Sequence, residues 1–158
     1  LDGPCRVYGD GRLACDTRID PRVFLLKMVP GLEPESLDLL VGSGIQGLVI
    51  ESFGAGGLPN LRRSFVPKIE QLLSVGIPVV VVTQCRYEGS DLSVYEVGRR
   101  IAEAGAIPGH DMTTEAAVAK LMWVLGHTRN LEEVRRLMLA NLCGEIDPGS
   151  TGEEGATP

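Results

Sequence analysis

Three short and nearly unbroken apolar runs constrain the fold of this chain more than any other feature of its sequence. They cover residues 23–29, 47–52 and 78–83. A run without alternating polar residues is typical of a strand that is buried on both faces, as in a parallel sheet. We therefore expect each run to form such a strand, and residues 105–108 would fit a short fourth one.

Amphipathic segments separate the apolar runs. Their apolar residues recur at helical spacing, which predicts helices over residues 34–41, 61–75, 93–104, 113–125 and 131–142. Asp91 and Ser93 are candidate N-caps for the third of these helices, as are Asp111 and Thr113 for the fourth. Strands that alternate with helices predict a three-layer α/β/α fold with a parallel sheet of about four strands.

The composition fits one globular domain and disfavours several classes of partner. A chain of 158 residues has the size of a single domain. Its net charge of −6 argues against direct contact with nucleic acid, which depends on clustered lysine and arginine. No apolar run is long enough to cross a membrane. The four cysteines form no group with metal-ligand spacing, so we expect free thiols, a cytoplasmic location and no metal or other cofactor.

The loops that follow the apolar runs are where ligand-binding residues are expected, because the carboxyl ends of parallel strands meet at one edge of a sheet. Glu51 and Ser52 end the second run and precede the glycines of the segment FGAGG. These glycines permit a tight turn with positive φ, but they lack the third glycine of a dinucleotide site. A strand-to-helix turn that also lines a carboxylate or amide ligand is the better interpretation.

Cys85 lies in the segment TQCRYEGSD, directly after the third run, where a nucleophile would be placed. A cysteine nucleophile needs a general base, and the histidines of this chain are His110 and His127. His110 lies in a loop and is the candidate partner. His127 follows a predicted helix, and we expect it to cap the carboxyl end of that helix. A partly buried structural thiol is the alternative interpretation of Cys85.

Four segments, taken in order, resemble one protein family. They are DPRVFLLKMVPGL, GLVIESFGAGGLP, GIPVVVVTQCRYEGSDLSVYEVGRRIAEAGAIPGHDMTTEAAVAKLMWVLG and NLCGEI. Together they resemble the C-terminal domain of cytoplasmic, type I-like bacterial L-asparaginases, and also the matching domain of the archaeal glutamyl-tRNA(Gln) amidotransferase D subunit. On this resemblance residues 20–146 form the domain, and residues 1–19 are the end of an interdomain connection. The polar, glycine-rich residues 147–158 are expected to be a disordered tail.

The resemblance implies a two-domain enzyme that hydrolyses asparagine to aspartate and ammonia. In that family the nucleophilic threonine lies in an N-terminal domain, whose motifs do not occur in this sequence. No catalytic residue is therefore expected here, and the chain alone is expected to be inactive. The expected partners are that N-terminal catalytic domain, further copies of the same protein in a dimer or tetramer, and asparagine or aspartate.

The resemblance also implies that this domain lends substrate-binding residues to a neighbouring subunit. Relatives often carry asparagine where this chain has Gly57, so Asn60 is the candidate from the glycine-rich segment. Tyr95 or Glu96 is the candidate from the start of the next helix, where a carboxylate would accept a charge-assisted hydrogen bond from the α-ammonium group of the substrate. A solvated position on the helix surface is the alternative for Glu96.

Some bacterial relatives have an allosteric asparagine site. The resemblance maps this effector pocket onto Glu51, Ser52, Gly54, Thr83, Gln84 and Cys85. In those relatives an arginine stands at the position of Glu51, where it can bind the carboxylate of the effector. The exchange to glutamate predicts weak or absent activation by asparagine.

Two other functions remain open from the sequence. A free-standing domain of this shape would suit a non-catalytic module for small-ligand binding or for dimerisation. The second resemblance allows a part in a tRNA-dependent amidotransferase.

Overall fold

The fold is built around a four-stranded parallel sheet. The computed structural model describes residues 16–54, 56–59, 63–85, 89–93 and 95–147. In chain order the elements are β1 (Val23–Lys27), the 3-10 helix η1 (Pro34–Leu39), β2 (Gly47–Ser52), α1 (Val66–Ser74), β3 (Val79–Thr83), α2 (Glu96–Glu103), β4 (Ile107–Pro108), α3 (Thr114–Leu125) and α4 (Leu131–Leu139). The strands lie in the order β1-β2-β3-β4, and every neighbouring pair is parallel. The predicted parallel sheet, with its short fourth strand, is confirmed.

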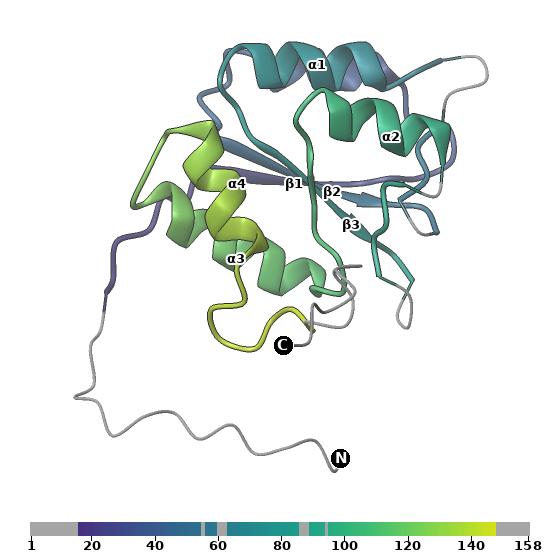
Figure 1. The fold of residues 1–158 in the computed structure, drawn as a ribbon. Helices are drawn as coiled ribbons and strands as arrows, with labels where there is room; N and C mark the ends of the chain where they lie inside the picture. Colours follow the sequence, from purple (N-terminus) through teal and green to yellow (C-terminus); the bar gives the residue numbers. More distant parts are fainter. Residues whose placement is uncertain (1–15, 55, 60–62, 86–88, 94, 148–158) are drawn as a thin grey trace.

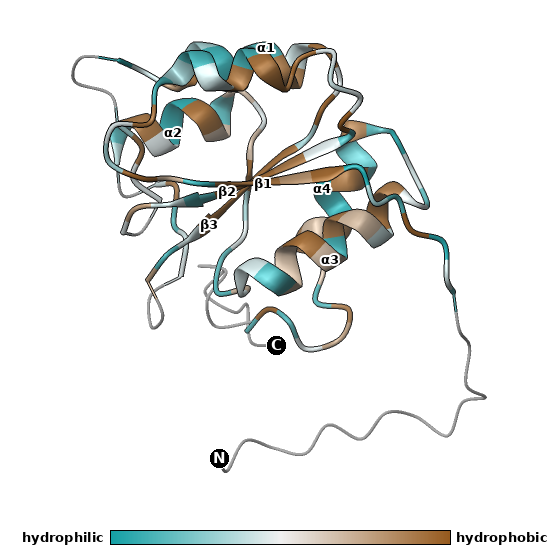
Figure 2. Ribbon diagram, turned by 180° about the vertical axis from the view of Figure 1, so that it is seen from behind, coloured by the Kyte–Doolittle hydropathy of each residue, from teal (hydrophilic) through white to brown (hydrophobic). Residues whose placement is uncertain are grey.

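Helices cover both faces of the sheet (Figure 1). Leu48 and Val81 belong to the core on the side of η1, α1 and α2. Val49 and Val82, their neighbours along the strands, belong to the core on the side of α3 and α4. Successive strand residues point to opposite faces, so a continuous apolar run fills both cores at once, as the brown central strands of Figure 2 show. The predicted three-layer arrangement is confirmed.

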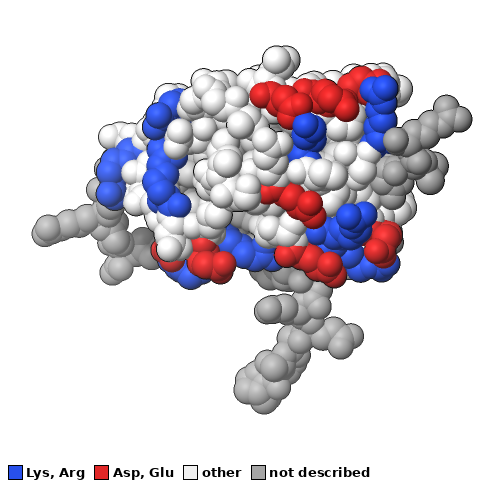
Figure 3. All heavy atoms as spheres, turned by 90° about the horizontal axis from the view of Figure 1, so that it is seen from above, with Lys and Arg blue, Asp and Glu red and all other residues white. Residues whose placement is uncertain are grey.

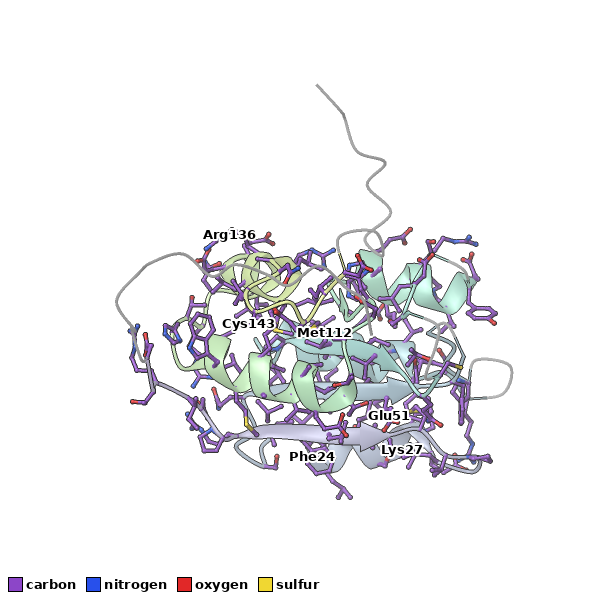
Figure 4. All side chains as sticks on the ribbon, turned by 90° about the horizontal axis from the view of Figure 1, so that it is seen from below. Phe24, Lys27, Glu51, Met112, Arg136 and Cys143 are labelled. Atoms are coloured by element: carbon purple, nitrogen blue, oxygen red, sulfur yellow. The ribbon has the colours of Figure 1, made fainter. Side chains whose placement is uncertain are left out.

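The expectation that residues 23–29 are buried on both faces is wrong. β1 is an edge strand, and within the described residues it pairs with β2 alone. Phe24 and Leu25 are each 41% exposed although they are apolar. Figure 4 shows Phe24 on this outer strand. Apolar composition did not distinguish an edge strand from a central one here, because it does not reveal whether a neighbour covers the strand.

Several helix boundaries also differ from the prediction. The predicted helix over residues 34–41 is a 3-10 helix that ends at Leu39, and α2 begins at Glu96 rather than at residue 93. Neither Asp91 nor Ser93 caps α2, because a carboxylate oxygen of Asp91 instead accepts the backbone N–H of Ser93 at 2.8 Å and closes a separate turn. The cap of α3 is confirmed, since the Thr113 hydroxyl accepts the N–H of Ala116 at 3.2 Å.

Lys120 fastens the last part of the domain to α3. Its ammonium group donates to the carbonyl oxygens of Met138 at 2.8 Å and Ala140 at 2.6 Å. It also forms an ion pair with Glu145 at 2.6 Å, and the two side chains are only 5% and 13% exposed. An ammonium group has three N–H donors, so each donor of this buried cation has a partner.

Replacing Lys120 by Met is expected to lower the free energy of unfolding by about 3 kcal/mol, because the carboxylate of Glu145 would remain buried without its cation. Urea denaturation of residues 1–158 measures this loss. Glu133→Gln is the matched control, since it removes an ion pair with Arg136 that lies on the exposed surface of α4. That control should change stability by less than about 0.5 kcal/mol. Equal losses of unfolding free energy in the two variants would contradict a stabilising role for the buried Lys120–Glu145 pair.

The same ion pair makes stability depend on pH. Burial alone would raise the pKa of Glu145, but hydrogen bonds from Lys120 and from the N–H groups of Leu142 and Cys143 outweigh burial and lower the pKa from 4.5 to about 2. A lowered pKa contributes stability that is complete above the unfolded value and is lost as pH falls through the folded one. We expect part of the acid destabilisation between these two values to disappear in Glu145→Gln, as measured by urea denaturation at each pH.

Candidate functional site

The carboxyl ends of β1, β2 and β3 meet at one edge of the sheet, and an ion pair marks the start of this region. Lys27 and Glu51 are register partners at the ends of β1 and β2. The ammonium group of Lys27 lies 2.7 Å from a carboxylate oxygen of Glu51, and Figure 4 shows the two side chains close together. Glu51 therefore has a cation beside it within its own domain.

A depression of about 480 Å³ opens at this edge of the sheet. Its wall combines the ends of β2 and β3 with the first turn of α3, and is formed by Glu51, Thr83, Gln84, Cys85, Gly89, Asp111, Met112, Thr113, Thr114 and Glu115. Four of the six residues predicted for the effector pocket thus lie together. Ser52 does not line the depression, because it is fully buried and donates to the carbonyl oxygen of Val82 at 2.7 Å. Gly54 is also absent from this wall.

The side chain of Gln84 ties two strands together. Its amide nitrogen donates to the carbonyl oxygen of Met28 at 2.7 Å and to that of Glu51 at 3.1 Å. Both acceptors belong to the chain at the ends of β1 and β2. The donor side of this amide is therefore used within the domain, so Gln84 shapes the depression while its amide N–H groups are engaged.

The glycine-rich turn after β2 is held to the end of β3 by a hydroxyl group. Gly54 and Gly56 have φ values of +49° and +116°, which confirms the positive φ expected for this segment. The hydroxyl of Thr83 donates to the carbonyl oxygen of Gly54, and it accepts the N–H of Cys85 at 2.9 Å. Thr83 thus fixes the glycine turn and the start of the next loop relative to one another.

A second depression, also of about 480 Å³, lies between the glycine turn and the start of α2. It is mostly apolar and is lined by Phe53, Gly57, Leu58, Pro59, Tyr95, Glu96 and Val97. Tyr95 is 47% exposed, and Glu96 is also exposed. Asn60, the third predicted substrate-binding residue, lies outside the described residues. The structure therefore brings Tyr95 and Glu96 together with the glycine turn on one surface.

Glu96 remains ionised on this surface. Its carboxylate accepts a hydrogen bond from Arg99 at 2.5 Å, one helical turn further along α2. This hydrogen bond, together with the positive charges of Arg99 and Arg100, lowers the pKa of Glu96 from its ordinary value. The carboxylate is thus available to a cationic ligand, in competition with Arg99.

The structure does not join Cys85 to a histidine. Cys85 is a free, partly buried thiol in the wall of the first depression, which agrees with the structural alternative. His110 contributes its carbonyl oxygen to the N–H of Ser90 at 2.6 Å, and its φ of +51° is unusual for a residue with a side chain. Burial lowers the pKa of His110, with opposition from Asp111 and Asp91.

His127 takes the place expected for it at the carboxyl end of α3. A ring nitrogen lies 2.7 Å from the carbonyl oxygen of Trp123, so the imidazole caps the last turn of the helix. Within the described part of the chain, no group of three acidic, histidine or cysteine side chains is arranged to hold a metal ion. The same residues include no helix with the length and apolar character that a membrane span requires.

Sequence reasoning missed Lys27 and the contribution of α3. Lys27 is the charged residue of an apolar run, and it stands at the same distance from the strand start as Glu51 does in the next run. That equal spacing was the signal in the sequence that could have predicted the pairing of Lys27 with Glu51. The first turn of α3 was recognised as a helix start, but its position beside β3 depends on the crossover from β4, which the sequence pattern does not specify.

Parallel strands in the sequential order β1-β2-β3-β4, covered by helices on both faces, define a three-layer α/β/α domain, and depressions lie at the carboxyl ends of its strands. Within this class, residues 22–138 match the model of the glutaminase/asparaginase C-terminal domain family. The match covers most of the chain, and the chain belongs to this family.

Both L-asparaginases and amidotransferase subunits are among the similar proteins. An L-asparaginase from Thermococcus kodakarensis is 47% identical over 138 residues, which are 87% of this chain and 42% of that protein. The D subunit of the glutamyl-tRNA(Gln) amidotransferase from Pyrococcus abyssi is 46% identical over 143 residues, which are 90% of this chain and 32% of that protein. The solved structure of the thermostable L-asparaginase from T. kodakarensis has a TM-score of 0.84 and 45% identity, covering 93% of this chain and 44% of that one. The chain thus spans less than half the length of these relatives.

Replacing Thr83 by Val is expected to loosen the glycine turn, because the carbonyl oxygen of Gly54 and the N–H of Cys85 would both lose their hydroxyl partner. The free energy of unfolding should fall by about 1 to 2 kcal/mol, and hydrogen exchange at the N–H of Cys85 should become faster. Thr83→Ser keeps the hydroxyl and serves as the control. Unchanged exchange at Cys85 in the Val variant would show that the hydroxyl does not hold this loop.

Proposed function

We propose that this chain is the C-terminal part of an L-asparaginase-type amidohydrolase, which converts asparagine to aspartate and ammonia. It supplies substrate and subunit contacts, while the nucleophilic threonine belongs to an N-terminal catalytic domain outside this sequence. The membership of the family carries the proposal.

The surface formed by Tyr95, Glu96 and the glycine turn is the proposed substrate contact. The ionised carboxylate of Glu96 can accept a hydrogen bond from the α-ammonium group of asparagine. Tyr95 adds an exposed ring that covers the apolar side of the substrate. Asn60 is proposed as a further contact from the same segment.

The position of the chain entry supports a contact with a neighbouring subunit. The segment before β1 lies against the carboxyl end of α3, where the N–H of Asp20 donates to the carbonyl oxygen of Met122 at 2.9 Å. The first turn of α3 borders the strand carboxyl ends, so its last turn lies at the opposite end of the sheet. The chain therefore enters the domain far from Glu96, and a second copy can meet the proposed contact surface. A homo-oligomer in the cytoplasm is the proposed state.

The first depression is proposed as an effector pocket that binds asparagine weakly or does not bind it. Glu51 stands in its wall where an arginine would be needed, so this position offers no cation to the carboxylate of an amino acid. Lys27 already pairs with Glu51 rather than offering its charge to a ligand. We therefore expect hyperbolic kinetics from the longer protein that contains this domain. A sigmoidal dependence of rate on asparagine that Glu51→Gln abolishes would contradict this expectation.

Residues 1–158 alone are expected to release no ammonia from asparagine, because the proposed nucleophile belongs to the N-terminal catalytic domain. Addition of the N-terminal domain encoded before them should restore hydrolysis. A coupled assay for ammonia measures both, with isothermal calorimetry as the second readout for the isolated chain. Tight binding of asparagine, aspartate or glutamine by the chain alone would favour a free-standing binding module instead.

In the longer protein, Glu96→Gln is expected to raise the KM for asparagine by about tenfold or more, because a charge-assisted hydrogen bond to the substrate is lost. Glu103→Gln is the matched control, since Glu103 is an exposed acid at the other end of the same helix. Its KM should stay within twofold of the parent value. Equal effects of the two substitutions would remove Glu96 from the proposed contact surface.

A part in a glutamyl-tRNA(Gln) amidotransferase is the second candidate function. The similarity to the amidotransferase subunit from P. abyssi carries it, because the identity of 46% is close to the 47% shared with the asparaginase. The mixed charges on the face seen in Figure 3 offer no continuous basic surface for RNA on that side. Stimulation of amide hydrolysis by glutamyl-tRNA and a partner protein would favour this second function.

A further inference from the structure

Residues 16–22 lie along the carboxyl end of α3 and lead directly into β1; we call this segment the strap. The N–H of Asp20 donates to the carbonyl oxygen of Met122 at 2.9 Å, and the carbonyl oxygen of Arg22 accepts the N–H of Gln46 at 2.7 Å. The strap therefore has backbone hydrogen bonds to the helix and to the residues before β2. These contacts join it to the domain on two sides.

Gly126 provides the space in which the strap lies. A Cβ atom at this position would stand 2.6 Å from the carbonyl carbon of Arg18 and 2.8 Å from the nitrogen of Ile19. Carbon atoms in van der Waals contact are about 3.5 to 4.0 Å apart, so a side chain here would displace the strap backbone. The φ of Gly126 is −69°, an ordinary helical value. Close approach, rather than backbone conformation, is what requires glycine.

Asp20 anchors the middle of the strap. Its side chain is buried, and its carboxylate accepts hydrogen bonds from Arg22 at 2.7 Å and from Arg129 in the turn between α3 and α4. Hydrogen bonds from Arg22, and to a smaller extent from Arg129, hold the pKa of this carboxyl well below its usual range in spite of burial. The anchor is thus charged throughout the physiological range and links the strap to two elements.

His127 holds the beginning of the strap. One ring nitrogen lies 2.8 Å from a carboxylate oxygen of Asp16, while the other lies 2.7 Å from the carbonyl oxygen of Trp123. The imidazole also contacts the Trp123 ring, with the centroids 4.0 Å apart. Arg18 forms a further ion pair with Asp16 at 2.5 Å. The two ends of the strap are therefore attached independently.

We propose that the strap is a fixed mount rather than a flexible tether, and that Gly126 is the positioning residue that seats it. A mount sets the direction from which preceding polypeptide reaches the domain. On the proposed function, this direction also sets how the surface with Tyr95 and Glu96 is presented to an active site. Gly126 acts through the strap and touches no substrate.

Limited trypsin digestion of residues 1–158 under native conditions tests the mount. Cleavage between Arg18 and Ile19 requires the strap to leave α3, because a protease binds its substrate in an extended form. Gly126→Ala should raise the initial rate of cleavage at this bond by at least tenfold. Far-UV circular dichroism establishes that the rest of the domain is folded.

A matched pair of arginine substitutions covers the case in which Gly126→Ala fails to fold. Arg129→Gln removes one hydrogen bond to Asp20, and Arg136→Gln removes an exposed pair with Glu133 on α4, away from the strap. Cleavage after Arg18 should be several-fold faster in Arg129→Gln and unchanged in Arg136→Gln. Equal cleavage rates in these two variants and in the parent chain would refute the proposal that the strap is held in a fixed position.

Kinetic measurements on the longer protein distinguish an error in the proposed role of the strap from an error in the proposed function. If asparagine is a substrate, Gly126→Ala should raise KM several-fold while kcat stays within about twofold, because the chemistry lies elsewhere. A protein without any asparaginase activity would refute the proposed function and leave the digestion result standing. A released strap with an unchanged KM would refute the positioning role.

Discussion

The burial of β2 and β3 between two helical layers is the constraint on which the rest of this domain depends. Leu48 and Ile50 face one layer while Val49 faces the other, and parallel pairing with neighbours on both sides satisfies the backbone of these strands. Because the strands are parallel, they end at the same edge of the sheet. That common edge brings Glu51 and Thr83 together although 32 residues separate them in the sequence. The depressions at this edge follow from the packing of the core.

Much of the fold could be predicted because the central strands have a simple pattern. Full burial on both faces requires apolar residues at every position, and residues 79–82 are four consecutive valines. β1 has a similar composition, yet it lies at the edge, since the number of strands on either side is a property of the assembled sheet. Helix starts were predicted where a side chain caps the helix, as Thr113 does. α2 begins at Glu96, and its N-cap residue Tyr95 makes no side-chain cap hydrogen bond, so the start of this helix left no comparable signal.

The candidate site was predicted in part, and the alternation of side chains along a strand explains the division. Glu51 and Ser52 are adjacent, so they face opposite ways, and one lines the depression while the other is buried against Val82. The sequence predicted that both residues lie at the end of β2. It did not predict which of them faces the depression and which faces the core. Tyr95 and Glu96 were identified by resemblance to a family rather than by pattern. The tight approach of the strap to Gly126 joins residues more than 100 positions apart, and no local pattern reports such a contact.

The partners of Lys120 make α3 and the last described part of the chain one cooperative unit. All three acceptors come from residues 138–145, although the lysine itself belongs to α3. A buried ammonium group that loses its acceptors is strongly unfavourable. Residues 138–145 therefore cannot leave α3 one at a time without cost, and local opening of this region is expected to expose Lys120 and detach these residues together.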